Sequence, residues 1–156
     1  MNKKLSIVFL SVIMLLVGCG KETKIKADEF KHFFPTVGSR IELKNVTVKS
    51  NGSGTVNFDW VLRNDDGESW SFLGSGITAY ATQDGDDSVT VGVDYERHNY
   101  RTKIEKDEKI DLEYELQNIN LNKPLILHFI PLEGDEWKLT ININDRSIQE
   151  EIIDRD

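Results

Sequence analysis

The sequence predicts an all-β fold of about seven to eight antiparallel strands, preceded by a short N-terminal helical turn. Apolar side chains occupy every second position in several short segments, which is the pattern of half-buried strands. Clusters of Asn, Asp and Gly separate these segments at intervals of about ten residues. Short alternating strands with turns at this spacing are typical of two packed sheets. We therefore expect an immunoglobulin-like β-sandwich.

The composition limits the classes of function. The chain has 156 residues, with 19 Lys and Arg against 27 Asp and Glu, which gives a formal net charge of −8. Nucleic-acid binding needs clustered cations, so this balance argues against DNA or RNA as a partner. The single cysteine excludes an internal disulfide and a zinc site built from several cysteines.

The first 18 residues have the features of an export signal. Lys3 and Lys4 precede an apolar run at residues 5–17, which is shorter than the roughly 20 residues of a transmembrane helix. The run ends at Gly18 and Cys19, and here the chain resembles a bacterial lipoprotein signal peptide with its lipobox. The resemblance implies cleavage after Gly18 and acyl chains such as palmitate on Cys19. The alternatives are an ordinary secretory signal and an uncleaved signal anchor.

Lipidation would anchor the mature chain to the extracytoplasmic face of the cell membrane. We assign residues 19–39 to the lipidated cysteine, a polar tether at 21–26 and a short helix at 27–34. Three phenylalanines in this last segment have the spacing of one helix face, and Pro35 would end the helix. The alternative for residues 27–34 is an extended strand.

Residues 40–144 carry the strand pattern of the sandwich domain. In residues 40–48 the apolar positions change phase at Lys44 and Asn45, which predicts a β-bulge or a strand that switches sheets. Residues 55–64 alternate clearly and end at an Asn-Asp-Asp-Gly turn. Shorter predicted strands follow at residues 70–72, 77–82 and 88–95.

The second half of the domain repeats this pattern. Residues 110–116 alternate between apolar and acidic side chains, and residues 137–144 alternate again after a Glu-Gly-Asp turn. Residues 125–130 are nearly all apolar, so we expect this strand in the middle of a sheet. Residues 145–156 form an acidic C-terminal tail, either frayed or a late edge element.

The order of these segments resembles a known family. The strand NVTV at 45–48, the turn in VLRNDDGESWSF at 61–72 and the apolar PLILHFIP at 124–131 carry the resemblance. They are similar to the small immunoglobulin-like, or telokin-like, extracellular domains that follow lipobox signals in uncharacterised Gram-positive lipoproteins. The sequence departs from that family at residues 106–109, where the family often has Pro-Gly. The resemblance implies a fold and a location, and it brings no catalytic residues.

Motifs for catalysis are absent from the sequence. There is no G-x-S-x-G, and the histidines His32, His98 and His128 are far apart and lack metal-ligand spacing. His128 lies in an apolar strand, opposite in phase to its apolar neighbours. We interpret it as a satisfied histidine on the sheet surface or in the core. We therefore predict a protein that is not an enzyme and that needs no cofactor.

Two acidic turns are candidates for a weak Ca²⁺ site. Calcium takes six to eight oxygen ligands, and both turns are rich in carboxylates. Neither turn fits the calcium-loop motif, and Asp and Gly are also ordinary turn residues. Solvated turns are therefore the alternative, and a shared site requires that the two turns meet at one end of the sandwich. The candidate ligands are Asp65, Asp66, Asp84, Asp86 and Asp87.

The longest polar segment, residues 96–109, is the candidate binding loop. Arginine and tyrosine are common interface anchors, and long loops on a rigid sandwich often carry binding function. The candidate partner-binding residues are Arg97, Tyr100, Arg101 and Lys103. The alternative for this segment is a solvated hairpin tip. We predict a protein-binding module for an envelope or secreted protein; the alternative is a lipoprotein that binds a cation or small ligand through its acidic turns.

An acidic ladder is a second candidate surface. Alternate residues of one strand, Asp111, Glu113 and Glu115, share the face opposite to the apolar side chains. This face is either a docking surface for a basic partner or a solvent face that discourages aggregation.

Overall fold

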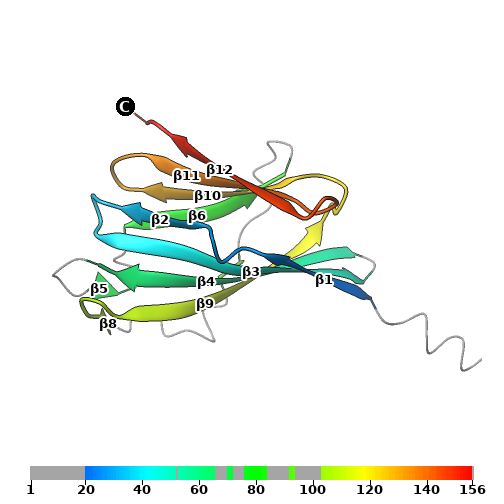
Figure 1. Ribbon diagram of the computed structural model, residues 1–156, viewed down its shortest axis with the longest axis horizontal. Helices are drawn as coiled ribbons and strands as arrows, with labels where there is room; N and C mark the ends of the chain where they lie inside the picture. The colour runs from blue at the N-terminus through cyan, green and yellow to red at the C-terminus, as the bar shows by residue number, and fades with distance from the viewer. Residues whose placement is uncertain are drawn as a thin grey trace, which may run out of the picture.

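The computed structural model describes residues 20–51, 53–65, 70–71, 76–83, 92–93 and 103–155. In these ranges the chain is all-β, and its antiparallel strands form two packed sheets, so the predicted β-sandwich is confirmed (Figure 1). The strands outnumber the seven or eight expected because short strands extend the sheets at both termini and in the connections. Within the described ranges, no helix is long and apolar enough to span a membrane.

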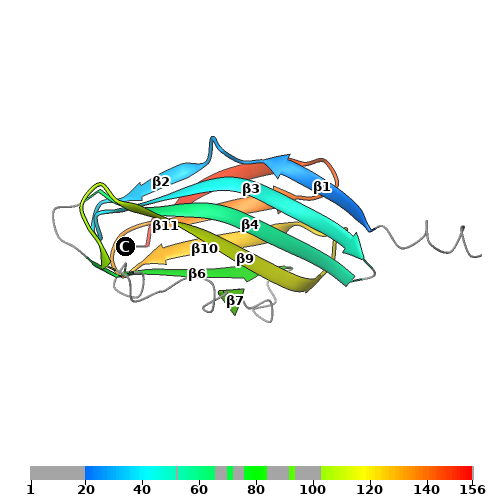
Figure 2. The same cartoon turned by 90° about the horizontal axis from the view of Figure 1, so that it is seen from below.

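The first sheet contains six strands. Its order is β1-β3-β4-β9-β7, and β2 also pairs with β3. The bounds are β1 Lys21–Lys26, β2 Lys31–Phe34, β3 Ser39–Asn51, β4 Ser53–Asn64, β7 Gly92–Val93 and β9 Lys109–Ile119. The two strands of the β3–β4 hairpin pair along their whole length and form the long central pair of this sheet (Figure 2).

The second sheet contains four strands in the order β12-β11-β10-β6. The bounds are β6 Ile77–Thr82, β10 Leu125–Pro131, β11 Glu136–Asn142 and β12 Ser147–Ile153. The apolar strand β10 lies between β11 and β6, which confirms the central position expected from its composition. A separate pair of two-residue strands joins β5 (Trp70–Ser71) to β8 (Lys103–Ile104).

The phase change in β3 is a β-bulge. The pairing of β3 with β4 shifts register between Leu43 and Asn45. Ile41 and Leu43 before the shift, and Val46 and Val48 after it, are all buried. The extra residue therefore keeps the apolar side chains facing the second sheet along the full strand, as the sequence predicted.

The N-terminal segment differs from the prediction. The expected tether at 21–26 is strand β1, which pairs with β3 beyond the bulge. The expected helix at 27–34 is wrong: a turn at residues 28–29 leads into β2, which pairs with the first part of β3. The free edge of β3 offers hydrogen bonds that a short, isolated helix could not match. The alternative of an extended strand is therefore the observed one.

The C-terminal segment is also part of the sandwich. β12 pairs with β11 over seven residues, from Asn142↔Ser147 to Glu136↔Ile153. The acidic tail is thus an edge element rather than a frayed end, and the sheets extend well beyond the predicted limits of 40–144. Lys138 and Glu151 form an ion pair at 2.5 Å across these strands, and Arg155 Nη1 donates to the Pro131 carbonyl at 2.9 Å.

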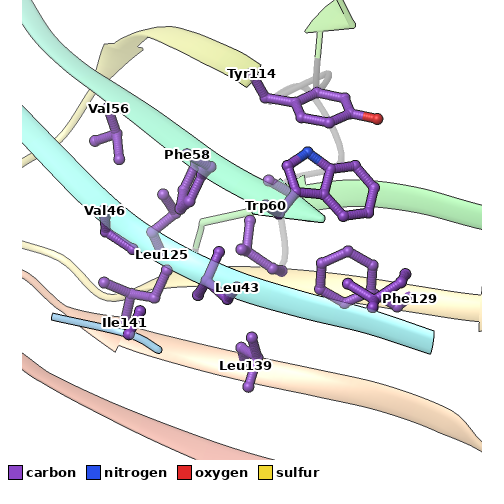
Figure 3. Packing of buried hydrophobic residues seen from close by; sticks show 14 of the residues in the cluster. Leu43, Val46, Val56, Phe58, Trp60, Tyr114, Leu125, Phe129, Leu139 and Ile141 are labelled. Carbon is purple, nitrogen blue, oxygen red and sulfur yellow. The ribbon is translucent and has the colours of Figure 1, made fainter. Parts of the chain in front are cut away.

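The core lies between the sheets and is rich in aromatic rings (Figure 3). Trp60 packs against Tyr114 on its own sheet, with ring centroids 4.7 Å apart, and against Phe129 on the other sheet at 5.5 Å. Phe129 in turn contacts Trp137 at 5.1 Å, and Trp137 stacks on His32 of β2 at 5.6 Å. This chain of rings connects the two sheets without a disulfide.

His32 occupies an apolar environment at the edge of this core. Its ring meets Phe34 edge-on at 4.6 Å and stacks on Trp137. Burial lowers the pKa of His32 below its ordinary value of 6.5, and the nearby carboxylates of Glu150 and Asp135 oppose part of this effect. Folding therefore favours the neutral form of the His32 imidazole over the protonated form.

This burial predicts a loss of stability in mild acid. Below pH 6.5 the unfolded chain binds a proton at His32 before the folded protein does, so the free energy of unfolding falls as the pH is lowered through this value. The His32→Phe variant should show a weaker fall. Urea unfolding of both proteins at about pH 7.5 and about pH 5.5 measures the difference. If the free energy of unfolding changes equally between the two pH values in both proteins, His32 makes no contribution to the pH dependence.

Candidate functional site

The first acidic turn begins at Asp65, immediately after β4. The carboxylate of Asp65 forms an ion pair with Arg40 of β3, with Nη2 and Oδ2 2.8 Å apart, and Arg63 lies at 4.0 Å. The Asp65 side chain is only 18% exposed. Its backbone nitrogen donates to the Gly38 carbonyl at 2.9 Å. Two arginines therefore already compensate the charge of this candidate cation ligand.

The same face of the sheet carries a continuous ion-pair network. Arg63 also approaches Glu42 at 3.8 Å, and Lys44 Nζ donates to Glu42 Oε2 at 2.8 Å. The hydrogen bond from Lys44, together with the charges of Lys44, Arg63 and Arg40, holds the pKa of Glu42 below its ordinary value of 4.5 despite partial burial. The network alternates in sign along β3 and β4, so its charges offset one another.

The remaining cation candidates, Asp66, Asp84, Asp86 and Asp87, lie outside the described residues. In the described part of the chain, no group of three or more His, Cys, Asp or Glu side chains is placed to hold a metal ion. Whether the two turns share one end of the sandwich thus stays a prediction. At Asp65, a cation would have to compete with Arg40 for the carboxylate.

The candidate binding loop is described only at its C-terminal end. Lys103 lies on β8 and is exposed, while Arg97, Tyr100 and Arg101 lie outside the described residues, as does His98. The C-terminal end of the loop is fixed to the domain, because the buried side-chain amide of Asn64 donates a hydrogen bond to the Ile104 carbonyl at 2.8 Å. Lys103 therefore stands next to a fixed point of the sandwich.

The acidic ladder lies on the outer face of β9, as the alternation predicted. Asp111 and Glu115 are exposed, whereas the intervening apolar side chains are buried. Lys109 approaches Asp111 at 3.9 Å, and Gln117 donates to Glu115 at 2.8 Å. The charge of Lys109 thus offsets part of the repulsion in this ladder.

A cluster around His128 on the outer face of the second sheet could not be identified from the sequence. His128 Nδ1 lies 2.5 Å from Glu136 Oε1, and Nε2 lies 3.0 Å from Thr82 Oγ1. The ring of Tyr80 stacks on the imidazole with centroids 4.5 Å apart and planes 5° from parallel. The four residues come from β6, β10 and β11, and only the strand pairing brings them together.

This cluster has the order hydroxyl, imidazole, carboxylate. A neutral imidazole that donates from Nδ1 to the carboxylate can accept the Thr82 hydroxyl proton at Nε2, which is the arrangement of a general base. Thr82 is only 5% exposed, however, so its hydroxyl, at the C-terminal end of edge strand β6, is shielded from solvent. The contacts fit the prediction that His128 is a satisfied histidine.

A cavity of about 20 Å³ lies between the sheets, beside the rings of the core. That volume holds about one water molecule, so an organic ligand would have to displace core side chains. The indole nitrogen of Trp60 borders the cavity and finds no hydrogen-bond partner among the described residues. The lining residues are Leu43, Phe58, Trp60, Ala79, Tyr80, Tyr114, Leu127 and Phe129.

Comparisons with known proteins add the following. No family model matches the chain, and no curated protein matches it. A solved structure, described as a conserved hypothetical protein from Bacillus anthracis, is similar with a TM-score of 0.47 and 12% sequence identity. The similarity covers 85% of this chain and 97% of that chain.

Proposed function

We propose that this chain is a lipid-anchored lipoprotein of the extracytoplasmic face of the cell membrane. Its immunoglobulin-like sandwich binds another envelope or secreted protein and catalyses no reaction. The observation that carries the proposal is the position of Cys19. It is the only cysteine of the chain, it ends an apolar run of signal-peptide length, and β1 begins only two residues later.

Two polar candidates, Asp65 and His128, are already engaged within the domain. Asp65 is engaged by Arg40, and His128 is engaged by Glu136 and Thr82. Groups held in this way stabilise and fix the sandwich. A lipid anchor would also confine the module to the membrane surface, and the resulting high local concentration makes a weak protein contact sufficient.

The lipid anchor can be tested by membrane fractionation. The wild-type protein should stay in the membrane fraction after washing with high salt, because acyl chains bind through burial of CH₂ groups rather than through charge. The Cys19→Ala variant should lose the anchor. It should then retain its uncleaved signal or appear in the soluble fraction. A Ser11→Ala variant, which changes the signal away from the cysteine, is the matched control. Equal fractionation of wild type and Cys19→Ala, with the signal cleaved at the same position in both, would disprove lipidation.

The binding function can be tested by crosslinking in cells, followed by mass spectrometry. One enriched envelope or secreted protein is expected with the wild type, and its recovery should fall with Cys19→Ala because the local concentration is lost. Reversing the charges of Arg97, Arg101 and Lys103 should abolish the contact if the loop carries it. Reversing Lys31, an exposed residue on β2, is the control. Recovery of no specific protein would contradict the proposal.

A further inference from the structure

The short connection between Cys19 and the sandwich limits how the domain can lie on a membrane. Two residues of extended chain span at most about 7 Å, so Lys21 stays within that distance of the lipidated residue. β1 is itself fixed, because it pairs with β3 from Lys21↔Ser50 to Lys26↔Asn45. Residues 21–26 therefore provide no flexible tether. This step rests on the proposed lipidation of Cys19.

One end of the sandwich surrounds the start of β1, and we call it the anchor end. It consists of Lys21 and Glu22, the end of β3 from Lys49 with the start of β4, the β9–β10 loop at residues 120–124 and the β11–β12 turn at residues 143–146. The register places them together: Gly54 at the start of β4 pairs with Ile119 at the end of β9. Figures 1 and 2 both show β1 beginning at this end, and the C-terminus lies at the other.

The β9–β10 loop at the anchor end is held in place by Gln83. The side-chain amide of this buried residue donates to the carbonyls of Asn120 at 3.0 Å and Lys123 at 3.3 Å. Its oxygen accepts the backbone N–H of Asn120 at 2.9 Å. The loop is therefore preformed, and Asn122 and Lys123 are exposed on it.

The charges of the two ends differ in sign. The described part of the anchor end contains four cationic and two anionic side chains. Its other polar side chains are mostly amides and hydroxyls. The cations are Lys21, Lys49, Lys123 and Arg146, and the anions are Glu22 and Asp145. At the opposite end, which we call the acidic end, residues 105–109 after β8 and the turn after β10 carry five acids against two lysines. These are Glu105, Asp107, Glu108, Glu133 and Asp135, with Lys106 and Lys109.

We infer that the anchor end rests on the membrane and that its cations contact anionic phospholipid headgroups. Electrostatic attraction to a membrane decays over about 8 Å at physiological salt, so only charges close to the anchor take part. β3 has 13 residues, which places the acidic end roughly 40 Å further out. The turns of the acidic end would then face the partner.

The chemistry of the anchor provides a clean labelling experiment. Acylation consumes the thiol of Cys19, so a cysteine introduced elsewhere is the only thiol of the mature lipoprotein. A fluorophore is attached to Asn122→Cys at the anchor end, or to Leu132→Cys at the acidic end, where Leu132 is 81% exposed. The full-length lipidated proteins are placed in phosphatidylcholine vesicles, with or without phosphatidylglycerol, that contain a headgroup-attached quencher lipid.

Quenching should be several-fold stronger at residue 122 than at residue 132, and phosphatidylglycerol should increase the contrast. Reversing the charges of Lys21 and Lys123 should remove that increase, whereas reversing Lys106 and Lys109 should not. Equal quenching at the two positions, in proteins that float with the vesicles, would overturn the orientation alone. A contrast that is independent of phosphatidylglycerol would overturn the headgroup contact. Failure to float would overturn the lipid anchor, and the inference with it.

Discussion

Replacing Trp137 with alanine is expected to lower the free energy of unfolding by about 3–5 kcal/mol, measured by urea unfolding of a soluble form that begins at Gly20. Trp137 is fully buried. It contacts Phe129 of its own sheet and His32 of the other, so one side chain connects the two layers. A domain of this size has a total stability of roughly 5–15 kcal/mol, so this loss is a large share of the whole.

The hydrogen bond of the indole can be separated from its packing. Trp137 Nε1 donates to Glu150 Oε2 at 3.2 Å, which links the core to edge strand β12. Trp137→Phe keeps most of the apolar surface and loses this bond, so it should cost less, on the order of 1–3 kcal/mol. Leu132→Ala, at a residue exposed on a turn, should change stability by less than about 0.5 kcal/mol. A Trp137→Ala cost near that of Leu132→Ala would contradict the packing shown here.

The strand pattern was readable because it follows from local alternation. Leu112, Tyr114 and Leu116 are buried and the acids between them face outward, since successive side chains of a strand point to opposite faces. The bulge at Lys44 was readable for the same reason, because a change of phase is visible in the sequence itself. These features need no knowledge of which strand pairs with which.

Features that depend on which strands pair with each other could not be predicted from the sequence. The phenylalanines at residues 30, 33 and 34 fit a helix face equally well, and only the unpaired edge of β3 decides for a strand. The acids of β12 looked like a solvated tail, yet Glu150 accepts a hydrogen bond from Trp137.

The candidate sites show the same limit. The sequence predicted that Asp65 lies in an acidic turn, as a weak cation ligand or a solvated side chain, but Arg40, 25 positions away, is placed beside it by the β3–β4 hairpin. Thr82, His128 and Glu136 meet only because β6, β10 and β11 are neighbours in one sheet. Phase alone indicated that His128 faces away from the core, and it could not name the partners.

Replacing Gly54 with alanine should destabilise the protein by about 1–3 kcal/mol or more. A Cβ at this position would lie 2.2 Å from the carbonyl oxygen of Ile119 and 2.6 Å from the Leu121 side chain. The carbonyl belongs to the backbone of β9, where the pairing with β4 shifts register next to Gly54. Relief of the contact therefore requires the two strands to move apart at the anchor end.

The sign of the effect distinguishes this explanation from a simpler one. If Gly54 were only a flexible residue, alanine would stabilise the fold by about 0.4–1 kcal/mol, because it reduces the entropy of the unfolded chain. A double variant, Gly54→Ala with Leu121→Ala, separates the two contacts. Removal of the leucine relieves the side-chain overlap and leaves the carbonyl in place, so most of the cost should persist relative to Leu121→Ala alone. Full rescue would mean that the side chain, and not the close approach of β9 to β4, requires glycine at this position.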